Sequence, residues 1–288
     1  MKRILIATDL SASAEQVAIY AYKLAQHLSA NLCICHTLNV PAEIPQSGIV
    51  AWPQAIYDGM DRDSKAELAK LKHKLISAGE PDAYVPAIVC VQAAGLVTDV
   101  VNAEAVRHQA DLIIMGTHAN DGLGTWLIGN HSRKMIEVAA CPLLLVPEGS
   151  IFRPVKRIAF GSDFKHPDLE LSAISQLIIL AKKLDAELVL THIQKNNKSE
   201  AMNTIIKELL IDLVRSHGHQ RVSVKVVNSD HVAGGLAWLV RHAHIDMLAM
   251  VHNRHSFLGE LLNASHTQQL AGQTPVPLLV FNSHHYEQ

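Results

Sequence analysis

The chain has 288 residues, of which 49% are hydrophobic, and its 25 Lys and Arg residues nearly balance 27 Asp and Glu residues. No apolar run reaches the roughly 18 residues that a transmembrane helix needs. Residues 1–148 carry 11 basic and 15 acidic side chains, and neither half has the strongly basic balance typical of nucleic-acid binding. Composition therefore predicts neither a membrane nor a nucleic-acid partner.

The first residues, MKRILIATDLS, combine two basic residues with a short apolar run and an early Asp9. This pattern indicates a first strand, because a secretory signal needs a longer apolar segment. The cysteines lie in or beside apolar runs, where free thiols behave as small buried hydrophobes, and they are Cys33, Cys35, Cys90 and Cys141. Their spacing matches neither a redox CxxC pair nor a zinc knuckle. We therefore expect buried, reduced thiols and a cytoplasmic protein.

Short apolar runs alternate with longer helical patterns along the first half of the chain. The predicted strands are 3–8, 31–37, 84–91, 112–116 and 143–147, and the predicted helices are 12–28, 61–78, 95–109 and 130–139. The runs 112–115 and 143–146 are apolar without alternation, as expected where helices cover both faces of a sheet. This order is typical of βαβ units and a parallel sheet.

The second half repeats the first. Its predicted strands are 157–162, 187–193, 222–227, 247–251 and 278–281, and its predicted helices are 168–184, 199–217, 234–243 and 265–271. Four anchors recur in one order: KRILIATD and KRIAFGSD, ANLCICH and AELVLTH, DLIIM and DMLAM, CPLLLV and VPLLVF. Such ordered self-similarity indicates a duplicated unit.

The predicted fold is therefore α/β, with two tandem doubly wound domains at 1–148 and 155–283, each a five-stranded parallel sheet flanked by helices. A short, turn-rich linker at 147–154 joins them. In a lone domain the final strands would lie at sheet edges, where unpaired backbone groups invite partners. We predict that the halves pair these edges across a pseudo-twofold axis as an intramolecular dimer, and the sequence leaves a homodimer of the whole chain open.

In such sheets, ligands bind outside the carboxyl ends of the strands, where the strand order reverses. Asp9 and Gly116 end the first and fourth predicted strands, and Thr37 ends the second, so the three should meet at one crevice. Residues 111–132, DLIIMGTHANDGLGTWLIGNHS, lead from a buried strand through a glycine turn to a second glycine at a helix start. Backbone N–H groups at such a helix start bind anions, which predicts a phosphate site.

With this motif and its tandem organisation, the chain resembles the universal stress protein family over nearly all of its length. The family motif is a glycine, two residues, a second glycine, nine residues and a third glycine followed by Ser or Thr, and here it runs through Gly116, Ala119, Gly129 and Asn130. The family's strand-end aspartate and histidine match Asp9 and His36. The resemblance implies a five-stranded, adenine nucleotide alpha hydrolase-like domain that binds ATP.

The resemblance also implies a role for each matching position. The first strand end would lie beside the adenosine, Thr37 would lend backbone atoms to the adenine, and Gly116 would let the loop approach the phosphates. The start of the fourth helix would cover the terminal phosphates. The implied binding residues are Ala7, Thr8, Asp9, Thr37, Met115, Gly116, Ala119, Gly129, Asn130, His131 and Ser132. The implied ligand is ATP, or AMP or ADP, together with Mg²⁺.

Two positions depart from the family pattern. Ala119 replaces the second glycine, and a Cβ there costs about 1 kcal/mol if the backbone needs a positive φ. Asn130 replaces the hydroxyl residue, although its amide still donates and Ser132 keeps a hydroxyl two residues later. Losing one charged hydrogen bond costs about 1.5–3 kcal/mol. We therefore expect weakened rather than abolished nucleotide binding.

The second half carries the same frame without its glycines. It reads Val251, Arg254 and then Ala264-Ser265-His266-Thr267, so a side chain occupies each glycine position. We expect this half to be closed to ATP and to serve as a degenerate structural or partner-binding copy. Asp163 matches Asp9 but lacks a glycine loop to converge with.

Other motifs are weaker. Gly122, Gly124 and Gly129 have the wrong spacing and position for a dinucleotide fingerprint, and no P-loop or GxSxG stretch occurs. Several histidines lie near the two loops, but no HxxxH spacing supports zinc; they are His118, His131, His252, His255 and His266. We expect His36 and His192, at strand ends, to close local hydrogen bonds. An aspartate such as Asp9 also commonly caps the helix that follows a first strand.

The sequence thus predicts a cytoplasmic tandem universal stress protein that binds an adenine nucleotide in its N-terminal half and has a regulatory or scaffold role in the stress response. No acid/base pair or nucleophile indicates a dedicated enzyme. Two alternatives stay open: a slow ATP hydrolase, which needs a water-activating group near Gly129, and a nucleotide-independent protein-interaction module. The protein partners are not indicated.

Overall fold

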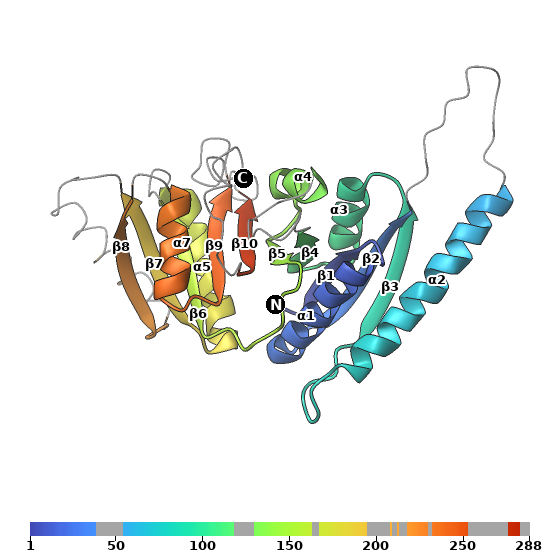
Figure 1. Cartoon of the computed structure of the whole chain (residues 1–288), viewed down its shortest axis with the longest axis horizontal. Coiled ribbons are helices and arrows are strands. Elements are labelled where there is room, and N and C mark those ends of the chain that lie inside the picture. Colours follow the sequence, from blue (N-terminus) through green and yellow to red (C-terminus); the bar gives the residue numbers. More distant parts are fainter. Residues whose placement is uncertain are drawn as a thin grey trace, which may run out of the picture.

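The computed structural model describes residues 1–38, 54–117, 130–162, 167–194, 218–229, 232–252 and 276–282, with Glu208 and Asp212. Figure 1 shows strands side by side across the molecule, with helices packed on the sheet. In the N-terminal half the elements are β1 (Arg3–Thr8), α1 (Ala12–Leu28), β2 (Asn31–Leu38), α2 (Gln54–Ser77), β3 (Ile88–Ala94), α3 (Val97–Arg107), β4 (Leu112–Thr117), α4 (Asn130–Val138) and β5 (Leu143–Pro147).

In the C-terminal half the elements are β6 (Arg157–Ser162), α5 (Pro167–Leu184), β7 (Glu187–Gln194), β8 (Val222–Asn228), α7 (Val232–His242), β9 (Met247–His252) and β10 (Leu278–Asn282). The ten strands form one sheet in the order β3-β2-β1-β4-β5-β10-β9-β6-β7-β8. Pairing is parallel within each half, and β5 pairs with β10 antiparallel. The strand order of the second half mirrors that of the first, which confirms the predicted pair of doubly wound domains and the joining of their final strands.

Two apolar layers hold the helices against the sheet. One layer includes residues of α1, α2 and α5, and the other includes residues of α3, α4 and α7. At the junction, Leu144 and Leu279 are 0% and 2% exposed and lie opposite each other in the β5–β10 pair. Phe152 of the linker packs edge-on against Tyr20 of α1, with ring centroids 5.2 Å apart. The first layer therefore continues across the boundary between the halves, and the second does so through the paired Leu145 and Leu278.

The duplication extends to individual hydrogen bonds. The carboxylate of Asp111 accepts from the backbone N–H groups of Lys2 and Arg3, and that of Asp246 accepts from Lys156 and Arg157. Each aspartate thus fixes the start of the first strand of its own half beside the fourth strand. Side chains that a sequence comparison aligned perform the same structural task in both copies.

The predicted elements agree with the structure except at a few boundaries. Helix α1 and strands β1 and β6 match their predicted limits, whereas β3 begins at Ile88 and not at residue 84. Pro86 lacks a backbone donor for a strand ladder, and Val85 beside it is 67% exposed. Helix α2 begins at Gln54, seven residues before the predicted start at 61. The predicted helix 265–271 and nearly all of 199–217 lie outside the described residues.

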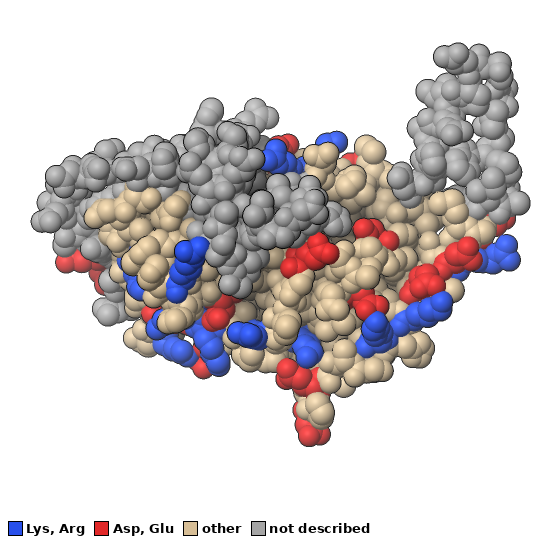
Figure 2. Space-filling view, in the orientation of Figure 1, with Lys and Arg blue, Asp and Glu red and all other residues tan. Residues whose placement is uncertain are grey.

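The surface and the cysteines complete the description. No helix in the described segments is long and apolar enough to cross a membrane. On the face seen in Figure 2, basic and acidic side chains alternate along the lower rim instead of gathering by sign. All four cysteines are free, but only Cys33 and Cys35 are buried; Cys90 and Cys141 are partly exposed. The prediction of four buried thiols was therefore wrong for two, because Cys90 lies on the edge strand β3 and Cys141 lies ahead of β5.

Candidate functional site

A cleft of about 180 Å³ opens at the carboxyl ends of the N-terminal strands. Its walls come from the ends of β1, β2 and β4, the start of α1, the start of α3, the start of α4 and the residue that follows β5. The lining residues are Ala7, Thr8, Asp9, Ser13, Ala14, Val17, Cys35, Thr37, Val97, Met115, Gly116, Thr117, Asn130, His131, Ser132 and Glu148. Segments far apart in the sequence therefore meet where the strand order reverses.

Nine of the eleven residues named from the sequence line this cleft. They are Ala7, Thr8, Asp9, Thr37, Met115, Gly116, Asn130, His131 and Ser132. The other two, Ala119 and Gly129, lie outside the described residues, as do His118, Asp163 and Arg254. All of the predicted residues that lie in the described part of the chain therefore line one cleft.

The turn between β1 and α1 is fixed by short polar side chains. Asp9 Oδ1 accepts from the backbone N–H of Ser11 at 2.9 Å, and Thr8 Oγ1 accepts from that of Leu10 at 3.0 Å. Ser11, not Asp9, is the N-cap of α1, because its hydroxyl accepts from the backbone N–H of Ala14. The structural alternative for Asp9, a cap of the following helix, therefore does not apply. Its exposed carboxylate instead closes the turn ahead of the helix, on the wall of the cleft.

His36 has a structural position beneath this turn. Its Nδ1 lies 2.8 Å from the carbonyl oxygen of Thr8, and in the second half the Nδ1 of His192 lies 3.2 Å from that of Ser162. Each imidazole therefore ties the end of its strand to the end of the neighbouring strand. The prediction that these histidines close local hydrogen bonds is confirmed.

Gly116 allows helix α1 to pack closely against the end of β4. A Cβ at this position would lie 3.0 Å from Val17 Cγ2, which is tighter than nearly all real contacts of this kind. The glycine therefore makes room for α1 as well as lining the cleft. A large residue at Gly116 would displace the helix, so it would not test ligand contacts alone.

The start of α4 faces the cleft. Asn130, His131 and Ser132 are its first three residues, and the backbone N–H groups of a first helical turn have no partner within the helix. The buried Ser132 hydroxyl donates to the carbonyl oxygen of Gly116 at 3.3 Å, which joins this helix to the end of β4. Together with the helix dipole, such an arrangement favours an anion at the helix N-terminus.

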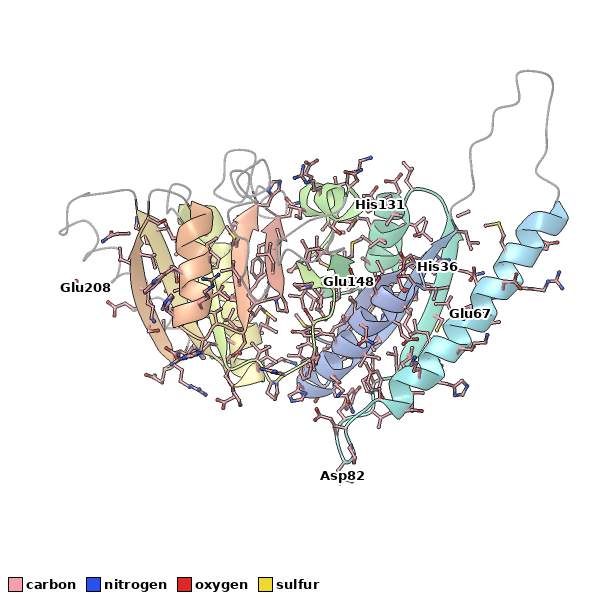
Figure 3. All side chains as sticks on the ribbon, viewed as in Figure 1. His36, Glu67, Asp82, His131, Glu148 and Glu208 are labelled. Carbon is pink, nitrogen blue, oxygen red and sulfur yellow. The ribbon has the colours of Figure 1, made fainter. Side chains whose placement is uncertain are left out.

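Among the lining residues that the structure describes, none is Lys or Arg. Two exposed carboxylates, Asp9 and Glu148, border the cleft, and His131 approaches it from α4 (Figure 3). Burial raises the pKa of the Cys35 thiol to about 12, so this part of the wall is a neutral thiol at physiological pH. In the described part of the chain, no three His, Cys, Asp or Glu side chains come together in a way that could hold a metal ion.

Sequence reasoning missed seven lining residues, which are Ser13, Ala14, Val17, Cys35, Val97, Thr117 and Glu148. Three of them lie on α1, and the helical spacing from residue 13 to 17 places them on one face. These three residues could have been predicted from the helical spacing once the turn after β1 was assigned to the site. Glu148 had no such signal, because it follows β5 and reaches the cleft only through the pairing of β5 with β4.

The second half has larger side chains at the corresponding positions. Glu170 takes the place of Ala14, counted from the ends of α1 and α5, and its carboxylate accepts from the hydroxyl of Ser162. Glu170 is only 6% exposed. Val251 takes the place of Gly116, and Ile193 takes the place of Thr37; both are buried. Each of the three is larger than its counterpart in the first half, and each is buried.

Comparisons with known proteins agree with this picture. The model of the universal stress protein family matches residues 1–147 and again 154–282. A Thermus aquaticus protein described as "Universal stress protein in QAH/OAS sulfhydrylase 3'region" is 30% identical over 150 residues, which are 50% of this chain and 98% of that protein.

Solved structures agree in fold. A universal stress protein from Archaeoglobus fulgidus DSM 4304 has a TM-score of 0.70 at 17% identity, covering 97% of this chain and 96% of that one. A protein from Pseudomonas aeruginosa UCBPP-PA14 has a TM-score of 0.59 at 15% identity, covering 100% of this chain and 96% of that one. At these identities the likeness concerns the fold.

Proposed function

Because this chain belongs to the universal stress protein family and carries the family domain twice, we propose that its N-terminal cleft binds an adenine nucleotide. The observation that carries the proposal is the convergence of nine residues from separate segments on one cleft, with the start of α4 among them. The adenosine would lie by the ends of β1 and β2, and the phosphates would lie by Gly116 and the first turn of α4.

The regulatory part of the proposal follows from the same residues. The Ser132 hydroxyl on the cleft wall donates to the carbonyl oxygen of Gly116, and a backbone carbonyl does not activate a nucleophile. We infer that nucleotide binding changes how the chain acts as a regulator or scaffold in the stress response, within the cytoplasm. The C-terminal half would be the structural or partner-binding copy, because larger, buried side chains stand at its corresponding positions.

The nucleotide would be ATP, ADP or AMP, with Mg²⁺ accompanying the charged phosphates. Asp9 and Glu148 at the cleft border favour this accompaniment, because a divalent cation reduces the repulsion between their carboxylates and a phosphate chain. Slow hydrolysis remains the second candidate function. It is favoured by the two carboxylates, either of which has the chemistry to orient a water molecule.

The decisive experiment places a side chain of the C-terminal half at the matching position of the N-terminal half. Ala14→Glu introduces the side chain that Glu170 supplies in the second half, and we expect it to weaken nucleotide binding to the full chain at least about a hundredfold, or about 2.7 kcal/mol. Calorimetric titration with ATP and Mg²⁺ measures this loss. Ala14→Ser is the matched control, because it keeps a small side chain, and it should bind like the wild type.

The outcomes separate the candidate functions. No heat with ATP, ADP or AMP on the wild-type chain would contradict nucleotide binding and favour the interaction module. Equal binding by wild type and Ala14→Glu would place the ligand elsewhere. Steady phosphate release by the wild type that Ala14→Glu abolishes would favour the hydrolase.

A further inference from the structure

The two halves meet at helix α4, whose start lines the cleft and whose end contacts the other half. The last residue of β10, Asn282, lies 3% exposed against the end of this helix. Its Nδ2 donates to the carbonyl oxygens of Glu137 at 2.7 Å and Ile136 at 3.3 Å. A strand of the C-terminal half therefore binds the end of a helix that belongs to the N-terminal half.

These contacts satisfy groups that a helix end leaves open. The last carbonyls of an α-helix have no partner within the helix and need donors from elsewhere. Asn282 supplies them for two of the last three residues of α4, and Asn102 of α3 supplies one for Val138, at 2.8 Å. Asn102 also accepts from the backbone N–H of Ala140 at 2.9 Å. The end of α4 is thus held by one amide from each half.

The arrangement is not symmetric. The residue that corresponds to Asn282 at the end of β5 is Pro147, which has no side-chain donor. The C-terminal half therefore donates a side-chain hydrogen bond to a helix of the N-terminal half, and Pro147 at the equivalent position cannot donate one in the other direction. A simple duplication would place the same residue at both strand ends. The Asn282 amide is therefore a feature that the C-terminal half has and the N-terminal half lacks.

Resting on the proposed function, we propose that Asn282 is a positioning residue, through which the C-terminal half holds α4 in register and so sets the nucleotide affinity of the N-terminal cleft. Helix α4 has only nine residues, so a shift at its end is transmitted to its start within about three turns. Its start is attached to β4 by the Ser132–Gly116 hydrogen bond. Without Asn282, that bond, the two Asn102 hydrogen bonds and the apolar contacts of Met135 and Ile136 must hold the helix.

Two variants test this. Asn282→Asp keeps the size of the side chain but removes both donors and places a carboxylate against two carbonyl oxygens. Asn282→Leu removes the donors without adding charge, and it serves if the aspartate variant does not fold. Asn228→Asp is the matched control, because it makes the same change at the exposed end of β8.

The readouts are hydrogen exchange of the α4 amides in the unliganded full chain and calorimetric affinity for ATP with Mg²⁺, both well below the melting temperature. Both Asn282 variants should exchange the amides of the last turn of α4 about tenfold faster and bind nucleotide about three- to tenfold more weakly, as loss of a net hydrogen bond predicts. Asn228→Asp should match the wild type in both.

The outcomes distinguish this inference from the proposed function. Unchanged exchange in both Asn282 variants overturns the inference. Faster exchange with unchanged affinity also overturns it, because Asn282 would then stabilise the helix end without positioning the cleft. Absence of nucleotide binding by the wild-type chain overturns the proposed function and with it the effect on affinity, while the exchange data still decide whether Asn282 holds α4.

Discussion

The N-terminal and C-terminal halves have the same strand order and the same strand-end histidines, but they differ in what fills the crevice. In the first half small residues at 14 and 116 leave a cleft, and in the second half Glu170 and Val251 stand at these positions and are buried. The difference lies in side chains and not in topology. The two copies therefore keep the same sheet while the side chains at these strand ends and helix starts differ in size.

Closing the crevice also adds to the core. Ile193 and Val251 are 7% and 8% exposed in the filled half, and fully burying a side chain of this kind contributes about 1.5–3 kcal/mol relative to leaving it in water. The open half gives up such contacts. It keeps two exposed carboxylates, a helix start and a neutral thiol around a cleft of about 180 Å³. The comparison suggests a division between a binding copy and a supporting copy, which the following predictions test.

The largest expected effect on stability is at the β5–β10 pair, which joins the two halves into one sheet. Leu279→Asp places a charge opposite Leu144 in the β5–β10 pair, where both side chains are buried in the apolar layer. Burying an unpaired charge costs several kcal/mol, and we expect a loss of at least about 3 kcal/mol in the free energy of unfolding. Urea unfolding followed by circular dichroism measures it.

A matched control shows whether the loss of stability is specific to the β5–β10 pair. Ile179→Asp makes a similar change on α5, where the isoleucine is 57% exposed, and it should change stability by less than about 0.5 kcal/mol. If Leu279→Asp were equally mild, the halves would be independent domains that merely touch. The comparison between a binding and a supporting copy would then lose its structural basis.

The next effect concerns the filled crevice. Glu170→Ala leaves the Ser162 hydroxyl without that acceptor and opens a small cavity, so we expect a loss of about 2 kcal/mol in the free energy of unfolding. It should not create nucleotide binding, because Val251 and Ile193 still occupy their positions. Differential scanning calorimetry and an ATP titration measure the two expectations.

The same change at an exposed carboxylate gives the control. Glu67 of α2 (Figure 3) is about half exposed, and its carboxylate pairs with Lys70. Glu67→Ala should leave both stability and binding as in the wild type. Nucleotide binding gained by Glu170→Ala would mean that one side chain closes the second crevice. The loss of glycines would then be secondary.

The sequence predicted the strands and the crevice because both depend on local pattern. Strand β1 and helix α1 have clear apolar periods, and a parallel sheet brings its carboxyl ends together whatever the loops do. Gly116 lines the cleft, as the position of its strand end predicted, but its close approach to Val17 was not foreseen. That contact depends on how closely α1 approaches β4, which no local pattern reports.

Other parts of the site depend on tertiary contacts and were missed for that reason. Glu170 has the residue type of an exposed helix position, yet it is buried because Ser162 lies opposite it. Glu148 and Asn282 follow strands in turn-like sequence and gain their positions from the β4–β5 and β5–β10 pairs. The sequence predicted that the final strands pair, but not the register or the helix end against which a side chain such as Asn282 packs.

The smallest expected effect is a pH dependence of folding stability that arises from a histidine of the C-terminal half. His219 precedes β8 and is 6% exposed, and burial lowers its pKa although hydrogen bonds to the backbone of Ala186 and Arg221 oppose the change. The nearby charges of Lys182 and Arg221 lower the pKa further. At the corresponding position before β3 the first half has Val85, which is 67% exposed.

The sign follows from comparing the folded and unfolded imidazole of His219. As the pH falls through the unfolded value of 6.5, the unfolded chain binds a proton that the folded chain excludes, so stability decreases until the folded imidazole is also protonated. His219→Gln removes this titration while keeping a hydrogen-bonding side chain. Urea midpoints at about pH 7.5 and about pH 5.5 should therefore differ less in His219→Gln than in the wild type. His73→Gln, at an exposed position of α2, should keep the wild-type difference, and an unchanged difference in His219→Gln would show that acid sensitivity arises elsewhere in the chain.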